Sequence, residues 1–392
     1  MWTFTKKLMV IVGVTLLVLS AAPEIVAQIV YGQPTSGSAQ MMYYHWKTTS
    51  EGEESTINQL MIPLSGFVPV RDNFEMSFYV ANSSNDYDAR NGTYKLSGLG
   101  DFLLQASHSF ADDRLLASAT VNLPIGKKEL NTEQTEVLFA LSQNHLEFPM
   151  RQFGGGFGFS LLVGGALELK ENMRAGAGLG YQYVGDYTPY EGARLLDTVM
   201  SDTTVIDYSG YNPGDVISAN AGIDYQRGRM LWSGDLIYSH YLADQLEDEE
   251  VFRQSRQFDW RFRCDFTGER NSFAAMLRYV WRGHNRVYSD TNYVTPKLFG
   301  NEFMVLAEYT QLFAGRWFVS PSADLRVIAG NEITTEVSSG SSSVLGFEAK
   351  VGRRLSEQLS ASLGGKLFTG SADDGNVDIS GYRISLALTG TL

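Results

Sequence analysis

The chain has 392 residues, a formal net charge of −13 at pH 7 and 12% aromatic residues. A chain this acidic is a poor nucleic-acid binder, and its single Cys excludes an internal disulfide framework and a cysteine-based metal cluster. The sequence contains 39 Gly but only 10 Pro. Together with the many aromatic residues, this composition favours β structure over disorder.

The N-terminus has the order of regions that is typical of a secretory signal. Lys6 and Lys7 precede the apolar run of residues 8–22, and small residues follow up to Ala27. We predict a signal peptide over residues 1–27 and a single domain over residues 28–392. The alternative is an uncleaved anchor helix, but the run is shorter than the ~20 residues that a spanning helix needs. No later segment resembles a transmembrane helix, so a membrane domain of this sequence would have to be a closed barrel.

Apolar and polar residues alternate in many later segments, each about ten residues long, which is the length that crosses a bilayer at a tilt. Successive side chains of a strand point to opposite faces, so a period of two predicts strands with one apolar and one polar face. The clearest example is FDWRFRCDF, residues 258–266, which alternates without interruption. The pattern also occurs in residues 156–169, 216–225, 273–281, 317–327, 344–351 and 381–392.

The connections between these segments alternate in length. Short polar turns are expected at residues 69–73, 111–113, 170–172, 226–229, 267–271, 314–316 and 356–358. Longer connections rich in Gly, Ser, Asn and Asp are expected at residues 81–95, 126–154, 186–214 and 282–297. This alternation is typical of an outer-membrane barrel with tight periplasmic turns and long external loops. We predict about 16 strands, or about 14 if the weaker candidates at residues 39–46 and 57–64 are not strands, with both termini in the periplasm.

Alternation alone does not separate a barrel from a secreted β-sandwich or an adhesin-like protein, because sandwich strands alternate too. The segments form one long meander, and aromatic residues such as Tyr181, Trp281 and Trp317 collect near strand ends, as in an interfacial girdle. Several polar faces also carry charges at mid-strand, and each Arg on the lipid side would cost about 2–4 kcal/mol. We therefore predict an all-β, transmembrane, antiparallel up-and-down β-barrel in the bacterial outer membrane, with short helical insertions in its external loops.

The mid-strand charges are the main candidate site. They would line the lumen, either setting the field that a solute meets or bracing the wall through salt bridges. Their signs alternate along the strands, so both readings stay open. The predicted lumen residues are Asp259, Arg261, Arg263, Asp265, Arg278, Arg282, Glu308, Asp324, Arg326, Glu348 and Lys350.

A second candidate is the connection at residues 131–149, which predicts a short helix. Asn131 or Thr132 can cap the helix, and Glu133 and Glu136 suit the positive end of its dipole. The helix could fold into the mouth of the barrel and narrow it, or it could merely pack on neighbouring loops. The apolar residues that would form the constriction are Val137, Leu138, Phe139 and Leu141.

Two glycine-rich stretches carry a family resemblance. Gly98, Leu99, Gly100 and Asp101 open one strand, and a following strand ends in Leu123, Pro124 and Gly126. The stretches GYQYVGDY at residues 180–187 and YNPGD at residues 211–215 are in the same style. The chain thus resembles the outer-membrane transporters linked to the meta-pathway of phenol degradation, a family allied to the long-chain fatty-acid transporters. The resemblance implies a barrel that passes small, often apolar molecules. Fatty-acid transporters also carry an N-terminal hatch, for which this chain has too few residues before its first strand.

The predicted function is passive uptake of small apolar or aromatic molecules through a charged lumen. The alternative is a closed barrel that serves as a receptor, an adhesin or a structural protein. The five His show no metal-binding spacing and no GxSxG motif occurs, so we predict no catalytic residue, no metal and no cofactor. The expected partners are outer-membrane lipid and lipopolysaccharide, a small solute and the barrel-assembly machinery. The last strand resembles the C-terminal signal of outer-membrane proteins, although Leu392 stands where that signal most often has Phe.

Overall fold

The computed structural model describes residues 34–191, 194–197, 203–206, 209–289, 292–332 and 338–392. The predicted signal peptide at residues 1–27 lies outside these ranges and stays a prediction. In the described ranges, no helix has the length and apolar character needed to cross a membrane.

Most of the described chain forms long antiparallel strands. The strands of the main sheet are β1 (Ser36–Ser50), β2 (Glu53–Arg71), β3 (Phe74–Ala89), β4 (Gly92–Leu99), β5 (Phe102–Phe110), β6 (Leu115–Leu123), β7 (Gly158–Lys170), β8 (Met173–Val184), β11 (Val216–Arg227), β12 (Met230–Tyr241), β15 (Gln257–Thr267), β16 (Asn271–Arg282), β19 (Glu302–Leu312), β20 (Trp317–Ile328), β23 (Ser342–Arg354), β24 (Leu359–Ala372) and β25 (Val377–Thr391).

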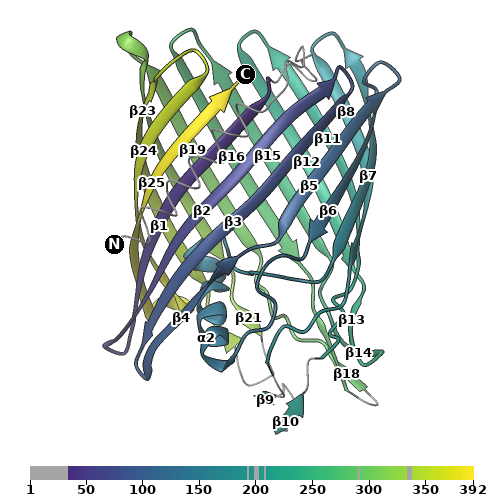
Figure 1. The fold of residues 1–392 in the computed structure, drawn as a ribbon, viewed down its shortest axis with the longest axis vertical. Helices are drawn as coiled ribbons and strands as arrows, with labels where there is room; N and C mark the ends of the chain where they lie inside the picture. The colour runs from purple at the N-terminus through teal and green to yellow at the C-terminus, as the bar shows by residue number, and fades with distance from the viewer. Residues whose placement is uncertain (1–33, 192–193, 198–202, 207–208, 290–291, 333–337) are drawn as a thin grey trace.

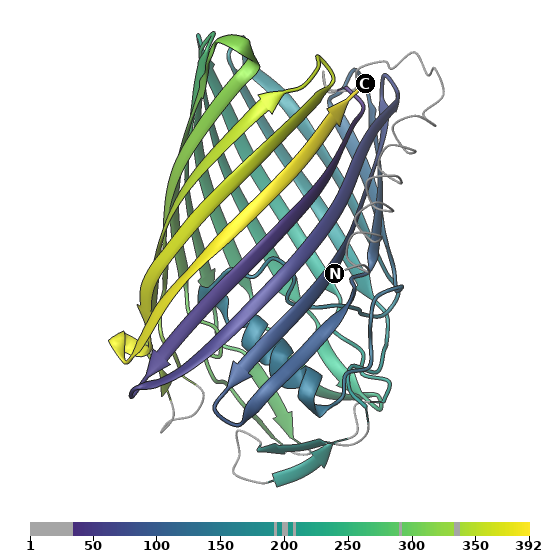
Figure 2. The same ribbon diagram turned by 60° about the vertical axis from the view of Figure 1, so that its left-hand side comes forward.

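These strands close into a barrel (Figures 1 and 2). Consecutive wall strands pair with each other, and β25 pairs with β1 from Ser36↔Thr391 to Ser50↔Val377, so the sheet closes on itself. The two short strands β4 and β5 lie one after the other along β3 and together fill a single position in the wall. The 17 strands of the sheet therefore make a barrel of 16 positions, which confirms the predicted fold class and strand number.

The remaining elements lie in the connections at one end of the barrel. They are helix α2 (Thr132–Leu141), the 3₁₀ turn η1 (Asn144–Leu146), the hairpin β9 (Arg194–Asp197) and β10 (Thr203–Ile206), the four-stranded sheet of β13 (Ala243–Leu246), β14 (Glu249–Arg253), β17 (Arg286–Ser289) and β18 (Asn292–Val294), the pair β21 (Asn331–Glu332) and β22 (Ser338–Ser339), and η3 (Asp373–Gly375). The opposite end carries short turns, including η2 (Ala314–Arg316), together with the start of β1 and the end of β25, which pair at Ser36↔Thr391 (Figure 1). The expected difference between the two ends is therefore present. We assign the short turns to the periplasmic side, as predicted, because tight turns are typical of that side.

One predicted loop is wrong. Residues 81–95 were expected as a long external connection because they are rich in Asn, Ser and Asp, but they continue β3 and β4 up to a two-residue turn at Arg90 and Asn91. Polar side chains on the inner face of a water-filled barrel stay hydrated, so a polar segment can form a strand there as well as a turn. The two weaker strand candidates, residues 39–46 and 57–64, are confirmed as parts of β1 and β2.

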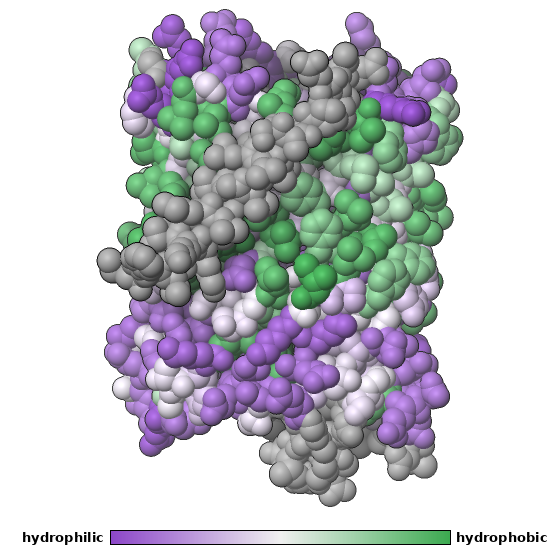
Figure 3. All heavy atoms as spheres, viewed as in Figure 1, coloured by the Kyte–Doolittle hydropathy of each residue, from purple (hydrophilic) through white to green (hydrophobic). Residues whose placement is uncertain are grey.

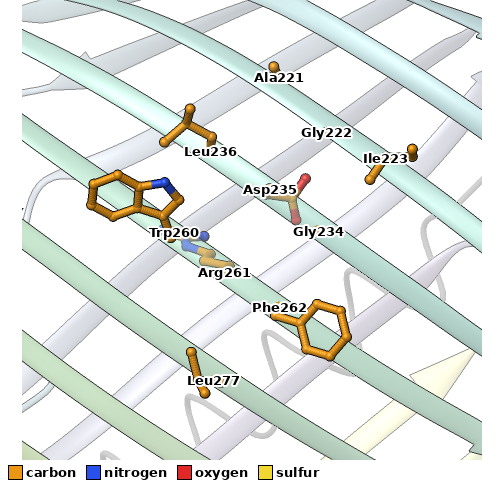
Figure 4. Close-up of a pocket in the computed structure, with 10 residues that line it drawn as sticks. All are labelled: Ala221, Gly222, Ile223, Gly234, Asp235, Leu236, Trp260, Arg261, Phe262 and Leu277. Carbon is orange, nitrogen blue, oxygen red and sulfur yellow. The ribbon is translucent and has the colours of Figure 1, made fainter.

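The outer surface carries an apolar band around the middle of the barrel with polar rims at both ends (Figure 3). The band consists of outward side chains, of which Val163, Leu179, Phe347 and Leu367 are examples. A shallow hollow of about 470 Å³ lies in this band at Gly234. Figure 4 shows Trp260 and Phe262 on the near side of the strands there, with Arg261 extending behind them. An apolar belt on a closed barrel is the exterior of an outer-membrane protein, so the predicted location is confirmed.

Placing a charge in this band tests the membrane orientation of the barrel. Phe262 lies in the middle of β15 and is half exposed to the outside. We expect Phe262→Arg to lower the free energy of unfolding by about 2–4 kcal/mol in lipid, because an Arg at the bilayer midplane loses its hydration. Urea titration of the protein folded into phospholipid vesicles measures the change.

The matched control is Phe313→Arg, in the short turn after β19, where Phe313 is similarly exposed. Its cost should be only about 0–1 kcal/mol because Arg near the interface stays hydrated. Equal costs at the two positions would contradict the orientation.

Candidate functional site: the lumen and its inserted loop

The connection between β6 and β7 folds into the external half of the barrel. It contains α2, which packs on β3 and β4, and η1, which packs on β20 and β23 on another part of the wall. Helix α2 is visible against the wall at the loop-bearing end in Figure 2. We call residues 124–157 the inserted loop. It places protein inside the lumen, as the constriction hypothesis requires, and it comes from the connection between β6 and β7.

The helix of the inserted loop begins as its sequence predicts. Asn131 is the N-cap, and its side chain accepts a hydrogen bond from the backbone N–H of Gln134 at 3.0 Å. The Gln134 side chain in turn accepts from the Asn131 backbone N–H, which completes a capping box. Such a cap pairs backbone N–H groups that the first turn leaves without partners, so these groups do not need acceptors on the barrel wall.

The apolar residues of the helix divide between anchoring and exposed positions. Val137 and Leu141 are 0% exposed and pack with Leu96 of β4 in one apolar cluster, with Leu138 partly buried beside them. Phe139 is 56% exposed. Among the four predicted constriction residues, two therefore fix the loop to the wall, and Phe139 is the one that can meet a solute.

The tip of the inserted loop is held by charges of the opposite wall. Glu147 forms ion pairs with Lys366 of β24 at 3.3 Å and with Arg326 of β20 at 3.6 Å. Arg326 also donates to the backbone carbonyl of Asn144 at 2.9 Å. These contacts join residues 179 to 219 positions apart in the chain (326 − 147 and 366 − 147). They are the reason why the loop tip reaches across the lumen.

An aromatic platform on the wall receives the next residue of the loop. The ring of Phe148 lies 6.0 Å from that of Tyr44 and 6.5 Å from that of Trp46, both on β1. Trp46 stacks on Phe368 of β24 at 4.3 Å. Gly381 lies between these two residues in the sheet, and a Cβ there would come within 3.1 Å of the Trp46 ring. The absence of a side chain at this position allows the stacking.

The base of the loop is fastened by Asp101, a residue of the glycine-rich stretch noted in the sequence. Its carboxylate accepts hydrogen bonds from the backbone N–H groups of Gly126 and Gly155, each at 2.9 Å, and from the Asn122 side chain at 2.9 Å. Gly126 and Gly155 lie at the two ends of the inserted loop. A single carboxylate therefore holds both ends, at the point where the wall passes from β4 to β5.

The predicted lumen charges lie on the inner face of β15 to β23, and most of them form ion pairs, either with one another or with other charges. Asp259 pairs with Arg261 at 2.7 Å and with Arg278 at 2.8 Å. Further pairs, at 2.5–3.2 Å, are Arg263–Asp265, Arg282–Glu302, Arg326–Glu302, Asp324–Lys366 and Glu348–Arg383.

Two predicted lumen residues, Glu308 and Lys350, instead line a hollow of about 470 Å³ near the short-turn end.

Four partners in these networks were not among the predicted residues. Lys366 and Arg383 lie on the polar faces of alternating strands, so the same period of two could have found them. Glu302 is the first residue of its strand, where alternation gives little signal. Glu147 is in a loop, and nothing in its local sequence indicates a contact with β20 or β24.

The other side of the lumen has many small inward side chains and open space, with the charged residues Glu168, Arg174 and Asp224 toward the short-turn end. The inward positions of β7, β8 and β11 include Ser160, Gly164, Gly178 and Asn220. A cavity of about 710 Å³ lies at the external end, between the inserted loop and these strands, and its inward aromatic side chains are Tyr79, Phe148, Phe153, Tyr187 and Tyr211. A second cavity, of about 1160 Å³, lies along the same strands toward the periplasm. Ser160 lines the first, and the next inward residues of β7, Leu162 and Gly164, line the second.

His145 in η1, at the loop tip, has a strongly lowered pKa. Burial, and then the positive charges of Arg151 and Arg326, lower the pKa of His145 to about 4. Its Nε2 is buried and makes no hydrogen bond. The fold therefore holds His145 as the neutral imidazole near neutral pH.

Neither a known protein family nor a curated protein sequence matches the chain. Solved barrel structures are similar to it at low identity. They include the CymD monoaromatic hydrocarbon channel (12% identity, TM-score 0.44, covering 96% of this chain and 92% of that chain) and a FadL homologue of Pseudomonas aeruginosa (8%, 0.44, 91% and 90%). OpdQ of Pseudomonas aeruginosa is similar too (8%, 0.42, 91% and 99%). No function is transferred from these proteins, and the link to phenol degradation stays a prediction.

The pKa of His145 predicts an acid-dependent release of the loop tip. Because the pKa in the folded protein lies below the ordinary 6.5, the stability contributed by neutral His145 is complete above pH 6.5 and declines as the pH falls toward 4. The loss should reach about 3 kcal/mol. Native-state proteolysis of the inserted loop between pH 7 and pH 4 measures the free energy of release.

The matched variant is His145→Gln, which stays neutral over this range. Its free energy of release should depend less on pH than that of the wild type, and carboxylates that titrate in both proteins cancel in the comparison. Identical pH profiles for the two proteins would show that His145 does not contribute.

Asp101 gives a prediction for the base of the loop. Asp101→Asn replaces one acceptor oxygen by an amide donor, which leaves at least one of the three facing N–H groups unpaired. We expect the free energy of loop release to fall by about 1–3 kcal/mol, measured by the same proteolysis. Asp248→Asn, in an exposed external turn with φ +68°, is the control and should have no effect. A loop that is equally protected in both variants would contradict the role of Asp101.

Proposed function

We propose that this protein is an outer-membrane channel for the passive uptake of small apolar or aromatic molecules. The observation that carries the proposal is the pair of cavities that follow one another along β7, β8 and β11 from the external end toward the periplasm. Their volumes, about 710 and 1160 Å³, suit small molecules. Diffusion along this side of the lumen needs no cofactor and no energy source.

The lining of the external cavity supports the choice of solute. Aromatic rings, among them Tyr79, Phe153 and Tyr187, supply many of its large side chains, and aromatic faces bind apolar and aromatic molecules by burial and ring contacts. Asp101, the acidic residue of this lining, is engaged in three hydrogen bonds. A neutral solute can therefore rest there without having to displace a charged partner.

The charged wall has a different role in this proposal. Its cations and carboxylates neutralise one another in pairs and lie mostly across the lumen from the small-residue strands. Paired charges produce little net field, so they brace the wall and hold the inserted loop rather than select solutes. This assignment favours the bracing interpretation of the predicted lumen residues.

The rival function is a closed barrel that acts as a receptor or adhesin. A closed barrel gives no ion conductance in a planar bilayer and no swelling of vesicles in a permeant solute. The proposed channel gives both, and it admits benzyl alcohol faster than a sugar alcohol of similar size into vesicles that contain lipopolysaccharide.

A pair of neighbouring residues on β7 tests the route. Ser160 points into the lumen at the cavity, whereas Leu161 is half exposed on the lipid side. We expect Ser160→Trp to reduce conductance and benzyl alcohol flux several-fold, because an indole fills much of the gap between the inserted loop and the wall. Single-channel recording and vesicle swelling measure the two quantities.

Leu161→Trp is the matched control, since Trp is tolerated on the lipid side of a barrel. It should leave conductance and flux unchanged. If Ser160→Trp also conducts normally, solutes take a different route through the barrel.

A further inference from the structure

The tip of the inserted loop is placed like a bound ligand. Glu147 and Phe148 are adjacent in the chain, so together they present one carboxylate and one phenyl ring. The carboxylate forms ion pairs with two cations of the wall, and the ring packs against the aromatic residues Tyr44 and Trp46. A free molecule with the same two groups would find the same partners.

The cationic half of this site belongs to the wall and does not depend on the loop. Lys366 is 6% exposed and is held by Asp324 at 2.5 Å. Gly346 pairs with Asp324 on one side and with Phe368 on the other, and a Cβ there would overlap the Lys366 side chain and the Asp324 carboxylate, so Gly leaves room for this pair. Arg326 is held by Glu302 at 3.2 Å. Both cations therefore stay in place when Glu147 leaves.

The aromatic half is also preformed. Trp46 and Phe368 stack on each other, and Lys366 lies 4.7 Å from the centre of the Phe368 ring. Tyr44 is fixed by Arg383, which lies 5.7 Å from the centre of its ring. The cationic and aromatic halves thus meet at Lys366 and Phe368, which are two residues apart on the inner face of β24.

Glu147 binds the two cations less closely than the wall carboxylates do. Glu147 has φ +54°, in the left-handed region that residues other than Gly rarely adopt. Its distances to Lys366 and Arg326, 3.3 and 3.6 Å, are longer than the 2.5 and 3.2 Å that these cations keep to the wall carboxylates. A free carboxylate without this backbone constraint can approach the two cations more closely.

We propose that the wall site formed by Arg326, Lys366, Tyr44, Trp46 and Phe368 binds a small arylalkanoate anion, and that such a solute displaces Glu147 and Phe148 and opens the lumen. The proposal rests on the channel function proposed above and adds a second solute class that controls it. Glu147 is the internal competitor for the site.

The displacing anion keeps the charge of the wall site balanced. Arg282, Glu302, Arg326, Glu147, Lys366 and Asp324 form one continuous chain of alternating ion pairs with three charges of each sign. Loss of Glu147 alone would leave one positive charge in excess, and the carboxylate of the bound solute restores the balance. The opened channel therefore conducts more without a shift toward anion selectivity.

The experiment uses 3-phenylpropionate as the probe, with propionate and 3-phenylpropan-1-ol as controls that lack the ring or the charge. Calorimetric titration of the full-length protein in detergent measures binding, and single-channel recording measures opening. We expect 3-phenylpropionate to bind and to raise the conductance without a shift in ion selectivity, and both controls neither to bind nor to raise the conductance at the same concentration.

Three variants test the residues. Glu147→Gln weakens the internal competitor, so it should raise the basal conductance and tighten probe binding several-fold. Lys366→Met should weaken binding about tenfold or more, because a charged hydrogen-bond donor is lost. Lys350→Met removes a lumen cation that lines a different hollow and should bind the probe like the wild type. Heat-modifiable gel mobility verifies the folding of each variant, and Glu147→Gln decides the matter if Lys366→Met does not fold.

Equal binding of the three compounds, equal effects of Lys366→Met and Lys350→Met, or a probe that lowers the conductance would each overturn the proposal. The two proposals fail separately. A protein that binds the probe but never conducts retains the wall site and loses the channel function, whereas a protein that conducts but ignores the probe retains the channel and loses the wall site.

Discussion

The structure depends on the pairing of β25 with β1. In lipid, every backbone N–H and C=O must find a partner within the protein, and only a sheet without edges achieves this with strands. Closure fixes one apolar face toward the lipid and one polar face toward the lumen for every strand, which is why a row such as Asp259, Arg261 and Arg263 can exist beside Trp260 and Phe262. It also encloses a space that is wider than side chains alone fill, so a connecting segment can enter it.

The inserted loop divides this space into two unlike sides. Along β1 to β4 and β20 to β25 it is fixed by apolar burial and by ion pairs such as Glu147–Lys366, whereas along β7, β8 and β11 small residues leave the cavities open. A loop fixed on one side only can narrow a channel without sealing it. The small residues therefore leave a route open for solutes, whereas the charges hold the inserted loop, which narrows that route.

The sequence predicted what depends on neighbouring residues and missed what depends on distant ones. Alternation predicted the strands and their faces, and Asn131 correctly marked the start of α2, because both signals are local. Residues 81–95 were assigned to a loop since Asn, Ser and Asp favour turns in water, but the lumen accepts them in a strand. Glu147 could not be found, because its partners lie on strands 179 and 219 positions further along the chain (326 − 147 and 366 − 147). Alternation also could not distinguish paired charges from free ones, since pairing depends on register.

The pairing of the wall charges also explains how such a charged lumen can serve apolar solutes. An unpaired cation facing the route would attract anions and water and would oppose an apolar molecule, whereas a pair such as Asp324–Lys366 exerts little force beyond its own neighbourhood. The exception is the pair of cations whose shared partner, Glu147, belongs to the movable element rather than to the wall. At that point neutrality depends on the position of the loop, so a change of loop position is at the same time a change of charge. A solute that replaces Glu147 must therefore supply the missing negative charge itself, which is the physical reason for an anion as the controlling ligand and for a neutral molecule as the cargo.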